Sequence, residues 1–121
     1  MISFDRASGN IAINDACVGW GYSGAPGHVG VVADEQLHGL GPLPAGRYLI
    51  CNPIANHLGP DSMPLTPDPA NRMYGRGSFF IHADNHEKPP QSSSEGCIVT
   101  GPDVRKLIEA QLAIDATLVV T

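Results

Sequence analysis

Apolar and polar residues alternate at the start of the chain, with the period of two that is typical of a half-buried β-strand. Ile2 and Phe4 follow this pattern, and so do Ile11 and Ile13. Residues 8–10 between the two pairs are serine, glycine and asparagine, a turn-forming composition. We therefore predict that the chain begins with a hairpin of two antiparallel strands.

Other short apolar segments bounded by turn-forming residues predict more strands. Val18, Trp20 and Tyr22 continue the period of two, and the chain ends on another apolar segment. The strands predicted beyond the hairpin cover residues 18–22, 45–52, 77–82, 98–99 and 116–121. Residues 21–44 are rich in glycine and residues 53–76 in proline, so both stretches predict loops rather than regular elements.

The pattern changes near the C-terminus, where residues 101–114 predict a helix. Pro102 suits the first helical position because its missing N–H would have no partner there, and Asp103 places a negative charge in the first turn. The apolar positions at helical spacing, which we expect to face the core, are Val104, Leu107, Ile108 and Leu112.

Composition fits this set of short elements. The 121 residues include 14 glycines and 11 prolines, which favours many turns between short strands. A chain of this length is the size of one domain, and no linker interrupts it, so we expect residues 1–121 to form a single domain. The predicted fold class is mainly β, either a β-sandwich or a partly closed barrel, with one short C-terminal helix.

The charge pattern argues against two classes of partner. The formal net charge is −5, and no lysine and arginine cluster offers a phosphate backbone a basic surface. No apolar run approaches 18 residues, and the first residues lack the basic and apolar regions of a secretion signal. We therefore expect no nucleic acid partner, no membrane span, and synthesis in the cytoplasm without a signal peptide.

The three cysteines differ in their surroundings. Cys17 and Cys51 lie inside apolar stretches, so we expect them in the core or in a mutual disulfide. Cys97 follows a run of serines, a glutamate and a glycine, and then begins an apolar segment. Three cysteines cannot all pair within the chain, and their spacing matches no C-x-x-C zinc or redox motif. At least one free thiol is therefore predicted.

Cys97 is a candidate nucleophile. A turn of small residues that leads into a strand can point backbone N–H groups of Gly96 and Cys97 towards an oxyanion, and glycine at 96 allows close approach of a substrate carbonyl. The thiol needs a base, and His82 is the leading candidate because it ends the apolar segment 77–82 just before the polar loop. The residues alone leave open a second interpretation, in which Cys97 is a buried structural cysteine and His82 a hydrogen-bonded strand-end histidine.

A zinc site is the competing chemical interpretation. His82, Asp84 and His86 occupy alternating positions, which would share one face of an extended segment, with Cys97 as a possible fourth ligand. This alternative predicts a zinc-dependent hydrolase. Against it, the segment leads directly into two consecutive prolines.

The stretch "IHADNHEKPPQSSSEGCIV" resembles the histidine-to-Ser-x-Gly-Cys signature of L,D-transpeptidases, cysteine enzymes that act on peptidoglycan stem peptides. Four segments, "GYSG", "GPLPAGRYLI", "MPLTPDPANRMYGRGSFFIHADN" and "SSSEGCIV", are similar to successive blocks of the L,D-transpeptidase effector family of the bacterial type VI secretion system. The resemblance runs from about residue 2 to residue 110 and implies an L,D-transpeptidase-like fold.

The resemblance implies roles for individual residues. Cys97 matches the nucleophile and His82 the base, while Ser94 and Gly96 match the loop that orients the histidine and shapes the oxyanion site. Two positions depart from the broader signature. Glu95 stands where histidine or asparagine is common, and Val99 stands where arginine often follows, so the anchor for a substrate carboxylate is left open.

Four residues are candidates for substrate binding. Arg76 could pair with a carboxylate through its guanidinium fork, and it lies in the stretch that leads to His82. Tyr22 and Ser23 precede the glycine-rich loop and could line the cleft. Glu95 could shape the choice of acceptor or simply face solvent.

The activity implied by the resemblance is acyl transfer from tetrapeptide stems without a cofactor. Attack of Cys97 at the third stem residue, meso-diaminopimelate in the family, would release D-alanine. Water as acceptor gives L,D-carboxypeptidase activity and a free D-amino acid gives exchange. The resemblance further implies secretion as an antibacterial effector, action in the periplasm of a target cell, and a cognate immunity protein. Two alternatives remain, namely a zinc-dependent peptidoglycan hydrolase that uses His82, Asp84 and His86, and a non-catalytic wall-binding module.

Overall fold

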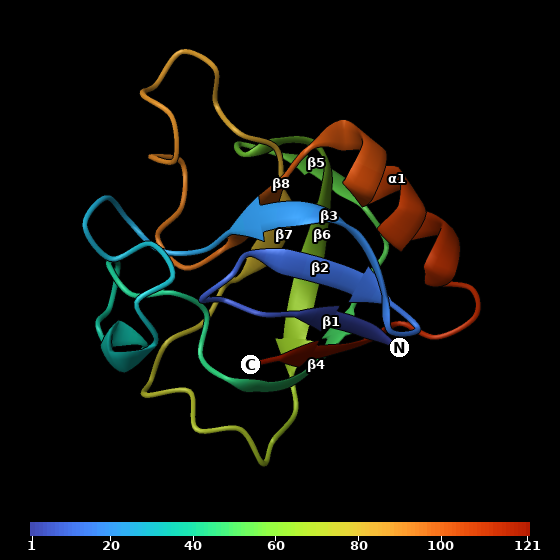
Figure 1. Ribbon diagram of the computed structural model, residues 1–121, viewed down its shortest axis with the longest axis horizontal. Helices are drawn as coiled ribbons and strands as arrows, with labels where there is room; N and C mark the ends of the chain where they lie inside the picture. The colour runs from blue at the N-terminus through green and yellow to red at the C-terminus, as the bar shows by residue number, and fades with distance from the viewer.

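Eight strands of the chain close into a β-barrel (Figure 1). The computed structural model describes residues 1–121. The barrel order is β4-β9-β1-β2-β3-β8-β7-β6, with β6 pairing back to β4, and β5 lies outside and pairs with β6. The strands are β1 (Ile2–Phe4), β2 (Asn10–Ile13), β3 (Ala16–Tyr22), β4 (Gly46–Ile50), β5 (Ile54–Asn56), β6 (Gly59–Pro67), β7 (Phe80–His82), β8 (Ile98–Thr100) and β9 (Thr117–Val120). The mainly β prediction is confirmed, and closure selects the barrel over the sandwich.

The predicted N-terminal hairpin is confirmed by the register of β1 and β2. These strands pair antiparallel, with Ile2 opposite Ile13 and Phe4 opposite Ile11. Two strand pairs of the barrel are parallel, namely β1 with β9 and β7 with β8. The second of these pairs brings together segments separated by the long loop of residues 83–97.

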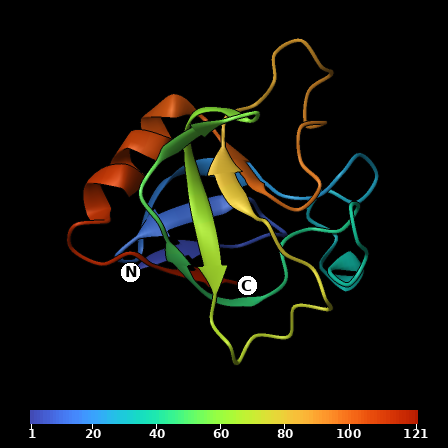
Figure 2. The same cartoon turned by 180° about the vertical axis from the view of Figure 1, so that it is seen from behind.

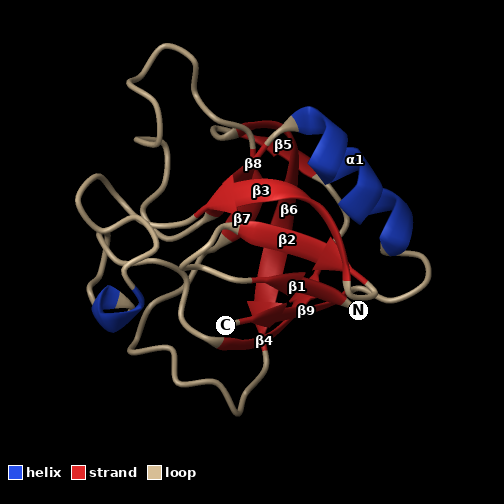
Figure 3. Ribbon diagram, viewed as in Figure 1, coloured by secondary structure: helices blue, strands red, loops and turns tan.

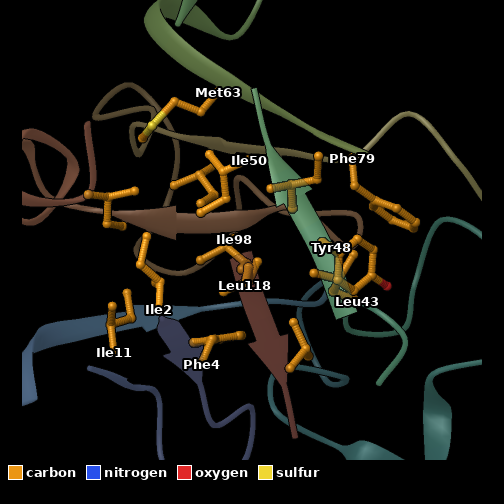
Figure 4. Close-up of a cluster of buried hydrophobic side chains, with 14 residues drawn as sticks. Ile2, Phe4, Ile11, Leu43, Tyr48, Ile50, Met63, Phe79, Ile98 and Leu118 are labelled. Carbon is orange, nitrogen blue, oxygen red and sulfur yellow. The ribbon is translucent and has the colours of Figure 1, made fainter. Parts of the chain in front are cut away.

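Aliphatic and aromatic side chains from most strands fill the interior of the barrel, as Figure 4 shows. Ile2, Leu118 and Ile98 are among the largest fully buried side chains. Burial of each such side chain contributes roughly 1.5–3 kcal/mol relative to exposure. Ile81 of β7 and Ile98 of β8 belong to this cluster and are opposite each other in the register. The core therefore fixes the relative position of the two strands.

The predicted helix is confirmed as α1 (Pro102–Gln111), which begins after Gly101. Ile108 is buried in the core, and Val104 packs close to Gly19 of β3, where an added Cβ would lie 2.4 Å from a Val104 methyl carbon. Leu107 is 48% exposed, so the expectation that it faces the core is wrong. Its neighbour Ile108 takes the inward position of that turn instead. No helix of this structure has both the length and the apolar character needed to cross a membrane.

The prediction of a loop for the proline-rich stretch 53–76 is wrong, because this stretch contains the whole of β5 and the whole of β6. Proline has no N–H for a strand ladder, which is why the stretch does not read as a strand. Within β6, however, Met63 and Leu65 keep the period of two and are buried. Pro64 between them still accepts a hydrogen bond, at 2.8 Å from the Cys51 N–H.

The cysteine predictions outside the candidate site are wrong. All three thiols are free, so Cys17 and Cys51 form no disulfide. Cys17 is exposed on β3, and Cys51 is half-buried with its Sγ 3.4 Å from Thr66 Oγ1. An apolar sequence neighbourhood does not place every residue inside, because alternate residues of a strand face opposite sides.

The longest loops gather at one side of the barrel, away from α1 (Figures 2 and 3). Residues 23–45 form one of them, as predicted, with a short 3-10 helix at Val32–Asp34. Residues 83–97 form another, between β7 and β8. These two loops frame the candidate site.

Candidate active site

The parallel pair β7–β8 positions the two candidate catalytic side chains. Ile81 lies opposite Ile98 and both point into the core, so the flanking residues on each strand point to the other side of the sheet. His82 ends β7, and Cys97 directly precedes β8. Both line one cavity of about 530 Å³, a volume typical of small-molecule sites. The structure therefore brings His82 and Cys97 to the same cavity.

The hydrogen bond of His82 fixes which ring nitrogen is available as a base. Its Nδ1 lies 2.7 Å from the backbone oxygen of Ala83. Because a carbonyl oxygen can only accept, Nδ1 carries the proton and Nε2 of the neutral ring is left with its lone pair. The side chain is 2% exposed, and this burial lowers the pKa of His82 below the ordinary imidazole value. His82 is therefore neutral at pH 7.

Cys97 is held as a neutral thiol in the resting site. Burial is the main cause that raises the pKa of the Cys97 thiol, and the negative charge of Glu95 adds to it. The backbone N–H of Phe80 and the charge of Arg76 act in the opposite direction. A raised thiol pKa beside a lowered imidazole pKa disfavours a preformed thiolate–imidazolium pair. A neutral thiol and a neutral imidazole that line one cavity instead suit transfer of the thiol proton to His82 during attack.

Ser94 is the centre of the hydrogen bonds that shape the loop directly before Cys97. Its hydroxyl donates to the carbonyl of Cys97 at 2.6 Å. The same oxygen accepts from the N–H of Gly24 at 3.0 Å and of Gly96 at 3.1 Å. Ser94 is 2% exposed and does not line the cavity. One buried hydroxyl thus connects the backbone of Cys97 to the glycine-rich loop of residues 23–45.

Ser23 makes a second tie between the same two loops. Its hydroxyl donates to the carbonyl of Gly96 and accepts from the N–H of Leu43, both at 2.8 Å. Ser23 is fully buried and does not line the cavity that holds Cys97. The structure therefore does not bring Ser23 to the position expected of a substrate ligand.

The backbone at Gly96 has a positive φ, which favours glycine over other residues. Its φ is +129°, a conformation that L side chains rarely adopt. A Cβ here would lie 2.6 Å from both Arg76 Nη2 and Phe79 Cε1. The Gly96 N–H already bonds to Ser94, so it is not open to the oxyanion that the sequence pattern suggested there.

Arg76 connects three segments of backbone beneath the cavity. It is 8% exposed, and each terminal nitrogen of its guanidinium donates two hydrogen bonds, at 2.6 to 3.0 Å. The four acceptors are the backbone carbonyls of Glu35, Gly41, Pro42 and Glu95. Arg76 lines the cavity, but the guanidinium fork expected to bind a substrate carboxylate is occupied. Its geometry favours a positioning role instead.

Tyr22 does not line the cavity that contains Cys97. Its hydroxyl donates to Asp84 Oδ1 at 2.8 Å and accepts from the Ser93 N–H at 3.0 Å. These contacts join the two ends of the loop between β7 and β8. Tyr22 lines a smaller neighbouring cavity of about 320 Å³. Asp84 had no role in the sequence analysis beyond zinc binding, because its partner lies 62 positions earlier in the chain.

The cavity also contains titratable residues that the sequence analysis did not place there. Glu95 lines it as a candidate, while Lys88, His57 and His38 were not predicted there. Lys88 comes from the loop between β7 and β8, and His57 from the turn between β5 and β6. His57 could not be found from sequence because the proline-rich hairpin that carries it was not recognised.

The residues expected to form a zinc site are separated. His82 lines the larger cavity, whereas Asp84 and His86 line the smaller one. No group of three or more His, Cys, Asp or Glu side chains in the structure could hold a metal ion. The zinc hypothesis required an extended segment that places His82, Asp84 and His86 on one face. That segment is absent, because β7 ends at His82.

Solved structures of L,D-transpeptidases share this fold. The L,D-transpeptidase from Mycobacterium smegmatis aligns over 99% of this chain and 57% of its own, with a TM-score of 0.58 and 12% identity. The Ldtfm–avibactam carbamoyl enzyme aligns over 99% and 47%, with a TM-score of 0.56 and 17% identity. The chain thus spans about half the length of these proteins. A search of curated proteins gives no match.

The sequence also matches a family model. The model of the Tlde1 domain covers residues 19–121, which include every β7 and β8 residue and both candidate catalytic side chains. This chain, with its L,D-transpeptidase-like barrel, therefore belongs to the Tlde1 domain family.

Proposed function

We propose that this protein is a cysteine enzyme that transfers acyl groups from peptidoglycan stem peptides. The observation that carries the proposal is that Cys97 and His82 line one cavity, where His82 ends β7 and Cys97 directly precedes the adjacent parallel strand β8 of an L,D-transpeptidase-like barrel. Membership of the Tlde1 domain family supports the same reaction class.

The proposed reaction begins with attack of Cys97 Sγ on the carbonyl at the L-centre of the third stem residue. His82 Nε2 accepts the thiol proton as the carbon–sulfur bond forms. The oxyanion accepts a hydrogen bond from the Cys97 N–H, since the Gly96 N–H is occupied by Ser94. His82 then returns the proton to the amine of D-alanine as the peptide bond breaks. The product is a thioester on Cys97.

Three acceptors can complete the reaction. Water releases a tripeptide stem, a free D-amino acid gives an exchanged tetrapeptide, and the side-chain amine of a second stem gives a cross-link. In each case His82 takes a proton from the acceptor, and the thiol of Cys97 is the leaving group. We propose hydrolysis and exchange as the main activities, following the effector family that the sequence resembles.

The biological role that we propose is that of an antibacterial type VI secretion effector acting in the periplasm of a target cell. Trimming or capping tetrapeptide stems removes the donors that cross-linking needs, which weakens the wall. A producing cell would need an immunity protein against this activity.

The test is release of D-alanine from tetrapeptide muropeptides, measured by mass spectrometry on the purified protein. We expect activity in the unaltered protein and its loss in Cys97→Ala and His82→Ala. Matched controls are Cys17→Ala and His86→Ala, which change exposed residues outside the catalytic cavity. Binding of muropeptides without any release of D-alanine would support the wall-binding alternative and contradict the proposal.

A further inference from the structure

Two charges of opposite sign stand unpaired in the cavity that holds Cys97. Its formally charged lining residues are Arg76, Lys88 and Glu95. The terminal nitrogens of Arg76 already donate hydrogen bonds to four backbone carbonyls. The side chains of Lys88 and Glu95 make no hydrogen bond, and no ion pair of the structure includes them. Their charges are therefore available to a ligand.

The backbone around these two residues is anchored, although the side chains are exposed. The Glu95 carbonyl accepts a hydrogen bond from Arg76 Nη2 at 3.0 Å, two residues before the nucleophile. The negative charge of Glu95 is close enough to the thiol to raise the pKa of Cys97. Lys88 follows a turn in which its N–H donates to the carbonyl of Asn85 at 3.0 Å. The two side chains do not pair with each other, so the cavity presents separate positive and negative groups.

A cavity with separated charges of both signs complements a ligand group that carries an ammonium and a carboxylate together. We propose that Glu95 and Lys88 bind the zwitterionic amino acid group at the end of a substrate side chain, with Glu95 contacting the ammonium and Lys88 the carboxylate. This inference rests on the proposed function, because a stem residue such as meso-diaminopimelate ends in that group. Lysine at the same position supplies the ammonium alone.

The sign of the charge nearest the nucleophile supports this assignment. The carboxylate of the terminal D-alanine is the other charge near the reacting bond, and Glu95 would repel it. The ammonium at the end of the third stem residue's side chain is attracted to Glu95 instead, and it neutralises the charge of Glu95 next to the thiol. The pair thus selects stems whose third residue carries both charges, and it makes Glu95 and Lys88 specificity-determining residues rather than catalytic ones.

The experiment measures peptide binding in the Cys97→Ala protein, which cannot form the thioester. Two tetrapeptides are compared by calorimetry, one with meso-diaminopimelate and one with L-lysine at the third position. Because an exposed ion pair contributes little free energy, we expect Lys88→Met to weaken binding of the diaminopimelate peptide about twofold to fivefold and to leave binding of the lysine peptide unchanged. Glu95→Gln should weaken both peptides by a similar factor. Lys106→Met, on the exposed surface of α1, is the matched control.

Two kinds of binding result would overturn the inference. An equal loss for both peptides in Lys88→Met would show that Lys88 binds the D-alanine carboxylate. No loss in either variant, or no binding of the diaminopimelate peptide at millimolar concentration, would remove the proposed role of the pair. Release of D-alanine by the protein with Cys97 intact is measured in parallel. Selective binding without turnover would contradict the proposed function while leaving this inference in place.

Discussion

Replacing Ser94 by alanine removes one hydroxyl that satisfies three buried backbone groups. The groups are the carbonyl of Cys97 and the N–H groups of Gly24 and Gly96. A buried polar group without a partner costs about 1–3 kcal/mol. Entry of water into the vacated space would relieve part of this cost, so we expect the free energy of unfolding to fall by about 2–4 kcal/mol.

Thermal and urea denaturation measure this loss directly. For a chain of 121 residues, the expected change corresponds to a decrease in Tm of roughly 10 °C. Ser8→Ala is the matched control, because Ser8 is exposed in a turn and its hydroxyl accepts a single hydrogen bond, from the Asn10 N–H. We expect that variant to stay within about 0.5 kcal/mol of the unaltered protein.

The same substitution should affect activity beyond its effect on stability. The Ser94 hydroxyl donates to the carbonyl of Cys97, the proposed nucleophile, so its loss should lower the rate of D-alanine release at temperatures where the variant is fully folded. A Ser94→Ala protein with unchanged stability and an unchanged rate would contradict this prediction, because it would mean that the three backbone groups need no partner in the folded site.

Three further predictions concern other parts of the site. Gly96→Ala should fold poorly or lose activity, because a Cβ would collide with Arg76 and Phe79 at a φ of +129°; wild-type circular dichroism together with a wild-type rate would contradict this. Arg76→Lys keeps the charge but not four donors, so its Tm should fall and its kcat should fall more than its KM rises, whereas a large rise in KM alone would indicate direct substrate binding. The folded chain binds a proton on His82 less readily than the unfolded chain does, so the stability that neutral His82 contributes is present above about pH 6.5 and is lost as the pH falls below it. Denaturation between pH 7.5 and 5 should therefore show a smaller decrease in stability for His82→Gln than for the unaltered protein, and equal decreases would contradict the assigned pKa direction.

Local patterns were sufficient where the sequence and the structure follow the same periodicity. The hairpin of Ile2 to Ile13 and the helix that begins at Pro102 both depend on neighbouring residues, and both were predicted. The β6 strand was not predicted because its three prolines are unfavourable for a strand. The alternation of buried and exposed residues around Met63 and Leu65 becomes visible only in the folded barrel. Cys17 was misplaced because an apolar neighbourhood does not say which face of β3 a residue occupies.

In the candidate site, the sequence indicated which residues to consider but did not give the role of each. The Gly-Cys and histidine pattern indicated Cys97 and His82, and the fold brings them to one cavity. The role expected of Arg76 depended on whether its donors were free, and they are taken by backbone carbonyls distant in sequence. Lys88 could not be placed in the cavity from sequence, because its position depends on how the loop between β7 and β8 folds back.

Formation of a thioester between Cys97 and a stem peptide can be tested by intact-protein mass spectrometry on the protein mixed with a tetrapeptide muropeptide and quenched in acid. We expect an added mass equal to the muropeptide less D-alanine, mapped by peptide digestion to Cys97 and strongly reduced in His82→Ala. Release of D-alanine that continues in Cys97→Ala, or an adduct that maps to Cys17 or Cys51, would contradict it.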